Sequence, residues 1–125
     1  MKKLATLFLA SLLSVASLSA WEQTIQTSDL EIKMKSVGNP TKGDNTFILT
    51  PTLNDKALEK ATIRVQFIMP EMSGMPAMKE TAQISEKNGT YEAKANLSMN
   101  GTWQVRVDIK SKEGKTYRAK TSIDL

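Results

Sequence analysis

The sequence predicts an all-β protein, an immunoglobulin-like antiparallel β-sandwich of about seven strands. After residue 20, short segments of alternating apolar and polar residues recur to the end of the chain, and this two-residue period is typical of strands. No long window in that part of the chain keeps a helical period. Asn-Gly pairs, which favour tight turns, separate several of the segments. A small closed barrel is the alternative architecture.

The individual strands follow from this alternation. In the first, Leu30, Ile32 and Met34 alternate with charged side chains, which indicates one buried face. The next covers residues 46–53, which are rich in threonine, and its Pro51 suggests an edge or a bulge. A polar connection follows. The remaining predicted strands are residues 63–69, 79–85, 90–97, 103–109 and 117–123.

The N-terminus has the features of an export signal. Lys2 and Lys3 precede an apolar stretch at 4–18, and small residues follow it up to Ala20. We therefore expect residues 1–20 to be a signal peptide, cleaved after about Ala20. Residues 21–125 would then form the β-sandwich domain in the periplasm. The alternative is an uncleaved N-terminal anchor that holds the domain on the periplasmic side, because the uncharged stretch is just long enough to span a bilayer.

Composition excludes several kinds of site. Without residues 1–20 the chain has 15 basic and 13 acidic residues, a formal net charge of +2, and its lysines are scattered. We therefore expect no nucleic-acid partner. The sequence contains no cysteine and no histidine, which excludes disulfides, Ser-His and Cys-His catalysis, histidine zinc sites and blue-copper sites. The carboxylates show no spacing typical of an acid/base pair, so we expect no enzymatic activity. They include Glu71, Glu80, Glu86 and Asp108.

The strongest functional signal is a methionine-rich loop. Four of the seven methionines follow one another at a spacing of three, in a window that also holds two prolines and a glycine. Such a window excludes an ordinary helix. Thioethers are neutral, soft ligands that prefer Cu(I), or Ag(I) as its mimic, over Zn²⁺. Glycine allows the chain to reverse at Ser73-Gly74, which would bring Met72 toward Met75. The predicted metal ligands are Met72 and Met75 first, then Met69 and Met78.

Ordinary packing is the alternative role for several methionines. Met69 continues the inward-facing series of its strand, and Met78 opens the next strand, where it would plug the end of the sandwich. Alternation fully explains Met34 as a core residue. Met99 precedes a turn and lies four residues before Trp103, so it is either a core residue or a lid. A tryptophan ring is also able to cap a soft cation.

Three segments resemble the YtkA-like/FixH-like domain family. They are Phe67-Ile68-Met69-Pro70-Glu71-Met72 with Gly74-Met75-Pro76, Gly89-Thr90-Tyr91-Glu92-Ala93, and Leu97-Ser98-Met99-Asn100-Gly101-Thr102-Trp103-Gln104-Val105. The resemblance covers the chain from about residue 28 onward. It implies an immunoglobulin-like sandwich exported to the periplasm or held at the outer face of a membrane. Within that fold, residues 99–102 would cross between the two sheets.

The same resemblance implies a role in copper handling, since related domains occur in heavy-metal efflux adaptors and accompany the assembly of copper-dependent oxidases. The family's methionine motif corresponds to Met69, Met72, Met75 and Met78 of this chain. We therefore expect a Cu(I) carrier or accessory factor in copper trafficking or resistance, with a membrane efflux or oxidase-assembly protein as partner. The alternative is a module that binds no metal and docks its Met-Pro loop into a groove on such a partner.

Overall fold

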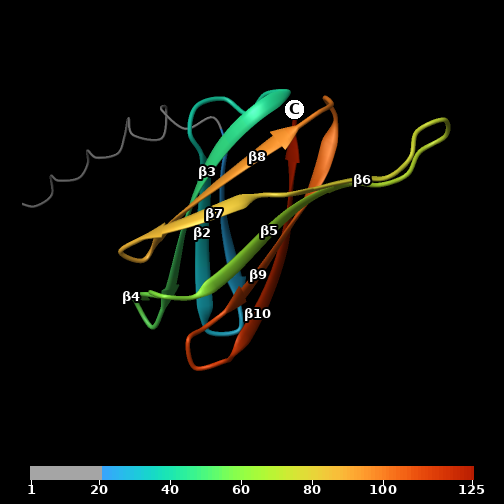
Figure 1. Ribbon diagram of the computed structural model, residues 1–125. Helices are drawn as coiled ribbons and strands as arrows, with labels where there is room; N and C mark the ends of the chain where they lie inside the picture. Colours follow the sequence, from blue (N-terminus) through green and yellow to red (C-terminus); the bar gives the residue numbers. More distant parts are fainter. Residues whose placement is uncertain (1–20) are drawn as a thin grey trace, which may run out of the picture.

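Two antiparallel β-sheets pack face to face (Figure 1). The computed structural model describes residues 21–125, and every strand named below lies in that part of the chain. The larger sheet has the spatial order β1 (Glu22–Thr27), β2 (Leu30–Ser36), β3 (Gly43–Leu53), β8 (Thr90–Leu97) and β7 (Gln83–Lys87), with β4 (Lys56–Ala57) paired to β3. The smaller sheet has the order β10 (Thr116–Asp124), β9 (Thr102–Lys110), β5 (Thr62–Met69) and β6 (Met78–Thr81).

The strand order confirms the immunoglobulin-like sandwich. In the usual lettering of that fold, β2, β3, β8 and β7 take the places of strands A, B, E and D. In the facing sheet, β6, β5, β9 and β10 take the places of C′, C, F and G. The alternative prediction of a closed barrel is wrong, because each sheet keeps two edge strands of its own. As the fold implied, the chain crosses from one sheet to the other between β8 and β9.

The predicted alternation places the core between the sheets. On β5, the side chains of Ile63, Val65 and Phe67 are buried while those between them face outward. Phe47 of the larger sheet meets Phe67 of the smaller one with ring centroids 5.2 Å apart. The largest side chain in this core is Trp103 on β9, only 1% of which is exposed. These apolar contacts across the two sheets are the main stabilising interaction of the fold.

A tight turn forms at Asn88-Gly89, as the sequence indicated, whereas Asn100-Gly101 lies in the crossover between the sheets. Asn88 and Gly89 both have positive φ, 54° and 84°, which is the type I′ geometry that suits the twist of a two-residue hairpin. They join β7 to β8.

Pro51 lies in β3 beyond the last β3–β8 pair, Leu49 with Tyr91. Beyond that pair, β4 and Leu58 cover the same side of β3, and the Leu58 N–H donates to the Pro51 carbonyl (3.0 Å). The Leu58 carbonyl takes its hydrogen bond from the Tyr91 hydroxyl instead, so no N–H is needed at position 51.

Three features of the strands differ from the predictions. Residues 22–27 form the edge strand β1, which was missed because Ile25 is its only large apolar residue. The two-residue β4 occupies part of the connection that was expected to be irregular. Residues 79–85 form two strands in different sheets, with Ala82 between them. Burial alternates without a break through Ala82, because the apolar side of both sheets faces the same interior.

The predictions of a signal peptide and of an uncleaved anchor concern residues 1–20, which lie outside the described part of the chain. Within residues 21–125, no helix is long and apolar enough to cross a membrane.

Tyr91 fixes the connection that leads into β5. Its hydroxyl donates a hydrogen bond to the Leu58 carbonyl (2.7 Å) and accepts one from the Ala61 N–H (3.0 Å). The side chain is almost completely buried, and burial raises the pKa of Tyr91 above the ordinary value of 10.0. The folded state therefore holds the phenolic proton more tightly than the unfolded state does.

Replacing Tyr91 with phenylalanine is expected to lower the free energy of unfolding by about 1–3 kcal/mol, because the partly buried Leu58 carbonyl and Ala61 N–H each lose their partner. The stability that comes from the raised pKa is fully present below pH 10 and is lost as the pH rises through that raised pKa. Urea denaturation at neutral pH and above pH 10 measures both effects. The difference between wild type and variant should shrink at high pH, and a constant difference would contradict this assignment.

Candidate metal site

The methionine-rich loop is a β-hairpin that extends the β5–β6 pair beyond the sandwich (Figure 1). The regular ladder ends with Met69 opposite Met78. Further out, Met72 and Met75 form an isolated antiparallel bridge. The Met72 N–H donates to the Met75 carbonyl (3.0 Å), and the Met75 N–H donates to the Met72 carbonyl (2.8 Å). The hairpin therefore holds its four methionines as two cross-strand pairs, an outer pair and an inner pair.

A two-residue turn at Ser73-Gly74 closes the outer pair. Within this turn φ is positive only at Gly74, where it is 80°. A positive φ at the second central position alone is characteristic of a type II turn, which requires glycine there. This geometry confirms the prediction that the chain reverses at Ser73-Gly74 and brings Met72 to Met75.

The outer pair is suited to share one soft ion. Two residues that exchange both hydrogen bonds across an antiparallel pair have Cα atoms about 5.5 Å apart and side chains on one face. Two sulfurs on one ion need a separation of about 4 Å, taking the zinc–sulfur bond length as a guide, and unbranched methionine side chains readily adjust over that range. Half of the Met72 surface is exposed, and Met75 is partly exposed. Both side chains are therefore in contact with solvent.

The inner pair belongs largely to the sandwich. Met69 is only 3% exposed, and its methyl group lies 3.1 Å from the position that a Cβ would take at Gly101. Met78 is partly buried against the core, and its sulfur accepts a hydrogen bond from the Ser98 hydroxyl (3.7 Å). Met69 and Met78 therefore pack against the core, as the alternative role predicted for them requires.

A hollow of about 320 Å³ is lined by one member of each pair, Met69 and Met72. Met69, Pro70 and Met72 form one wall, and the opposite wall comes from the start of β9 and the connection before it, including the amide side chains of Asn100 and Gln104. Three residues of extended chain, about 10 Å, separate Met69 from Met72 along the hairpin. The structure therefore does not gather all four sulfurs around one point, but it places Met69 and Met72 on the same hollow.

Within residues 21–125, the other methionines and the tryptophans lie in or against the core. Met34 is fully buried, as its alternation predicted, and Met99 packs partly buried against the core. The Trp103 indole is buried and donates a hydrogen bond to the Met99 carbonyl (3.0 Å), so its face is not open to an ion. Trp21 packs edge-on against Phe47 with ring centroids 5.6 Å apart.

The sequence profile described as YtkA-like matches residues 24–108, about two-thirds of the chain. The chain belongs to the YtkA-like family. The fold is also similar to the crystal structure of a DUF4426 family protein from Pseudomonas aeruginosa PAO1, with a TM-score of 0.61 and 15% sequence identity over 83% of this chain and 96% of that chain. At that identity the likeness concerns the fold alone. No curated protein shows a significant match to this YtkA-like chain.

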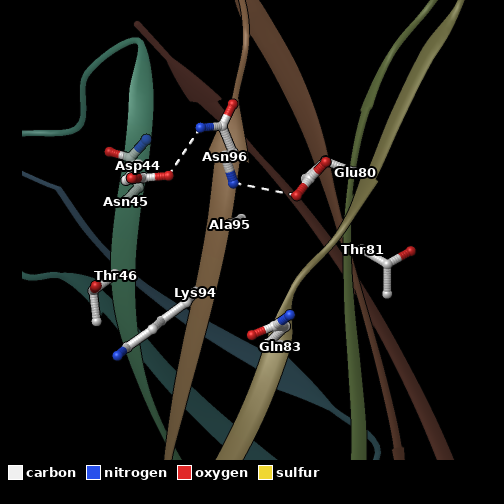
Figure 2. Close-up of a pocket in the computed structure, with 9 residues that line it drawn as sticks. All are labelled: Asp44, Asn45, Thr46, Glu80, Thr81, Gln83, Lys94, Ala95 and Asn96. Carbon is white, nitrogen blue, oxygen red and sulfur yellow. Dashed lines mark hydrogen bonds between the residues drawn. The ribbon is translucent and has the colours of Figure 1, made fainter.

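A second hollow of this YtkA-like protein, about 500 Å³, is polar and lies elsewhere. Figure 2 shows that Asn96 stands between the two carboxylates that line it. The Asn96 amide donates to Asp44 (2.8 Å), and the Asn96 N–H donates to Glu80 (3.2 Å). Since β7 does not reach far enough to pair with Asn96, the Glu80 carboxylate takes the place of a strand carbonyl. This bond ties β6, the base of the methionine hairpin, to the opposite sheet.

The carboxylates singled out in the sequence are not brought together in this YtkA-like fold. Glu86 accepts a hydrogen bond from the Lys60 N–H (2.7 Å), and Asp108 pairs with Arg64. Glu71 lies exposed on the hairpin. Among the described residues, no group of three or more aspartate, glutamate, histidine or cysteine side chains is placed to hold a metal.

Sequence reasoning missed three residues around the hairpin of this YtkA-like protein. Ser98 contacts the Met78 sulfur, while Asn100 and Gln104 line the hollow beside Met72. All three are far from the methionine window along the chain, and Asn100 had been interpreted only as a turn residue. No local signal marks them, because the packing of the β8–β9 crossover against the hairpin is what places them there.

Proposed function

We propose that this protein binds Cu(I), with Ag(I) as a mimic, through the thioethers of Met72 and Met75 at the tip of the β5–β6 hairpin. The observation that carries the proposal is the hydrogen-bonded pairing of these two residues across a two-residue turn. It supplies two soft, neutral sulfurs on one face of the hairpin. Met69 is the next ligand, because it shares a hollow with Met72. Met78 is the fourth, and its sulfur would first have to leave Ser98.

The arrangement suits a carrier that must release its ion. Two thioethers leave positions on the ion open to ligands from a partner, and the tip of the hairpin extends beyond the sandwich (Figure 1). The protein would act in the periplasm as a carrier or accessory factor in copper trafficking or resistance. Its partner would be a membrane efflux or oxidase-assembly protein. Thioethers do not titrate at ordinary pH, so binding is expected to persist in mild acid, where histidine and thiolate sites weaken.

A specific observation favours a second function. Met72 is one of two large hydrophobic side chains that are well exposed among the described residues, and it borders the largely apolar hollow of the hairpin. An exposed methionine beside such a hollow also suits docking onto a protein partner without any metal. The two functions differ in whether they need sulfur or only apolar surface.

An anaerobic titration of the purified protein with Cu(I), using a chromophoric competitor, tests the proposal. Wild type is expected to bind one ion saturably, and the Met72→Leu/Met75→Leu variant is expected to bind at least about tenfold more weakly, since leucine keeps the apolar volume but offers no ligand. Met99→Leu is the matched control and should bind like wild type. The midpoint of thermal unfolding should be nearly the same in both variants as in wild type.

Either of two outcomes would overturn the metal proposal. One is a folded wild-type protein that does not bind Cu(I), and the other is equal binding by wild type and the double variant. Both outcomes would favour docking of the hairpin on a partner instead, because apolar docking tolerates the exchange of methionine for leucine.

A further inference from the structure

The outer face of the smaller sheet gathers basic side chains from three strands. In the register of β5, β9 and β10, Arg64, Asp108 and Arg118 form one cross-strand row. Gln66, Arg106 and Lys120 form the next row. We call these two rows, together with Lys110 at the end of β9, the basic face. It holds five cationic side chains around a single carboxylate, and a second carboxylate, Asp124, lies at the far end of β10.

All three arginines of the chain lie on this face, whereas its lysines are spread over the sequence. Arginine differs from lysine in offering a planar fork of N–H donors that matches a carboxylate with two parallel hydrogen bonds. Residues 64, 106 and 118 are distant in sequence, so only the strand register brings them together. The concentration of arginine therefore indicates recognition of planar anions rather than general solubility.

The charges on the basic face are not balanced internally. Asp108 pairs with Arg64 (3.2 Å) and lies 3.9 Å from Arg118. Arg106 and Lys120 stand directly opposite each other, and within residues 21–125 neither forms an ion pair with a carboxylate. Like charges directly opposite on neighbouring strands destabilise a sheet. An anionic group from outside would relieve this repulsion.

The surface is hollowed where these charges meet. All five charged residues of the two rows line a depression of about 470 Å³, namely Arg64, Arg106, Asp108, Arg118 and Lys120. A neighbouring depression shares Arg106 and Lys120 with it and reaches Gln104, which also lines the hollow beside Met72. The basic face therefore continues along the sheet to the base of the methionine hairpin.

We propose that the basic face is the docking surface for an acidic segment of a partner protein. The Arg106–Lys120 pair would receive its carboxylates, and the neighbouring arginines would extend the contact. The two aromatic rings of β9 and β10, Trp103 and Tyr117, are buried on the opposite side of the sheet, so this face offers no platform for stacking nucleic-acid bases. Threonine, serine and glutamine surround the charges, and none of these inserts into a lipid bilayer.

Docking on the basic face does not require that the hairpin bind a metal. If the hairpin does bind Cu(I), docking would bring a partner close to the bound ion. An acidic partner held on the basic face would lie next to the hollow that leads to Met72. A partner bound there is able to present its own ligand to an ion on the outer methionine pair. The metal-free protein is therefore the right form in which to test docking, because copper binding then plays no part in the result.

The probe is a fluorescein-labelled peptide of eight glutamates, titrated with the metal-free full-length protein and followed by fluorescence anisotropy. Arg106→Gln/Arg118→Gln is expected to weaken binding roughly tenfold or more, since it removes two forked donors. Lys33→Gln/Lys35→Gln on the outer face of β2 removes the same charge from the other sheet, and it should bind nearly as well as wild type. Arg106→Lys/Arg118→Lys keeps the charge and should still weaken binding several-fold.

Three outcomes would overturn the proposal. Equal weakening by the two glutamine variants would show that only net charge matters. Unchanged binding in the lysine variant would remove the role of the guanidinium forks. Binding to phosphatidylglycerol vesicles without binding to the peptide would assign the face to a membrane surface. Thermal unfolding checks that each variant is folded, and the side chain of Arg118 is 81% exposed, so its replacement leaves the core intact.

Discussion

Replacing Gly74 with proline is expected to abolish Cu(I) binding although all four methionines of the hairpin remain. Proline fixes φ near −65°, whereas Gly74 has a φ of 80°. The two-residue turn is then impossible, and Met72 and Met75 lose the hydrogen bonds that hold them opposite each other. Since no atom lies within 4 Å of a Cβ added at Gly74, the effect would come from the backbone alone and not from a clash.

Ser73→Pro is the matched control, because it places the same residue one position earlier. The first central position of a type II turn has φ near −60° and favours proline. The extended Met72 before it is also the conformation that proline prefers in its predecessor. This variant should bind Cu(I) like wild type and gain about 0.4–1 kcal/mol of stability by restricting the unfolded chain.

The same anaerobic Cu(I) titration, with circular dichroism to confirm the fold, compares the two proline variants. Wild-type affinity in Gly74→Pro would show that the thioethers do not need the turn, and the paired geometry would then carry no function. Loss of binding in Ser73→Pro would contradict the turn type. A site built by the reversal at Ser73-Gly74 requires that Ser73→Pro retain Cu(I) binding and that Gly74→Pro lose it.

The second large effect concerns the core. Trp103→Ala is expected to lower the free energy of unfolding by about 3–5 kcal/mol, the usual range for removing a fully buried large aromatic side chain. Trp103 is 1% exposed, and its indole N–H holds the Met99 carbonyl at 3.0 Å. The substitution therefore removes both a large part of the core and an anchor of the crossover between β8 and β9.

Urea denaturation monitored by circular dichroism measures this effect, with two comparison variants. Trp103→Phe keeps much of the apolar volume but leaves the Met99 carbonyl without its donor, so a loss of about 1–3 kcal/mol is expected. Val37→Ala changes a side chain that is 60% exposed and should stay within about 0.5 kcal/mol of wild type. A loss below about 1 kcal/mol in Trp103→Ala would mean that Trp103 does not anchor the core.

The hairpin combines a fixed base with an accessible tip. At the base, Met69 is packed against Gly101, and Glu80 ties β6 to the opposite sheet through Asn96. At the tip, the only regular contacts are the two hydrogen bonds between Met72 and Met75. This arrangement holds the Met72–Met75 pair in place without burying it. If the pair binds Cu(I) as proposed, it would suit transfer of the ion between proteins better than permanent storage.

The sequence by itself determined most of the strands and the turn at the tip of the hairpin. Alternation along Ile63, Val65 and Phe67 is a local property, because successive side chains of a strand point to opposite faces whatever lies beside it. The reversal at Ser73-Gly74 is also local, since it depends on the freedom of glycine at one position. For these reasons the fold class and the approach of Met72 to Met75 were predictable.

Only the tertiary structure decided which strands neighbour each other. The strand neighbours in turn decided which side chains meet on the surface. Residues 79–85 alternate without interruption and yet divide at Ala82 between two sheets, because a local period does not record the partner strand. Met69 and Met78 have the same spacing as the outer methionines but are drawn toward the core by the base of the hairpin. The arginines meet on one face because the register of three strands, set by contacts across the whole chain, places them in adjacent rows.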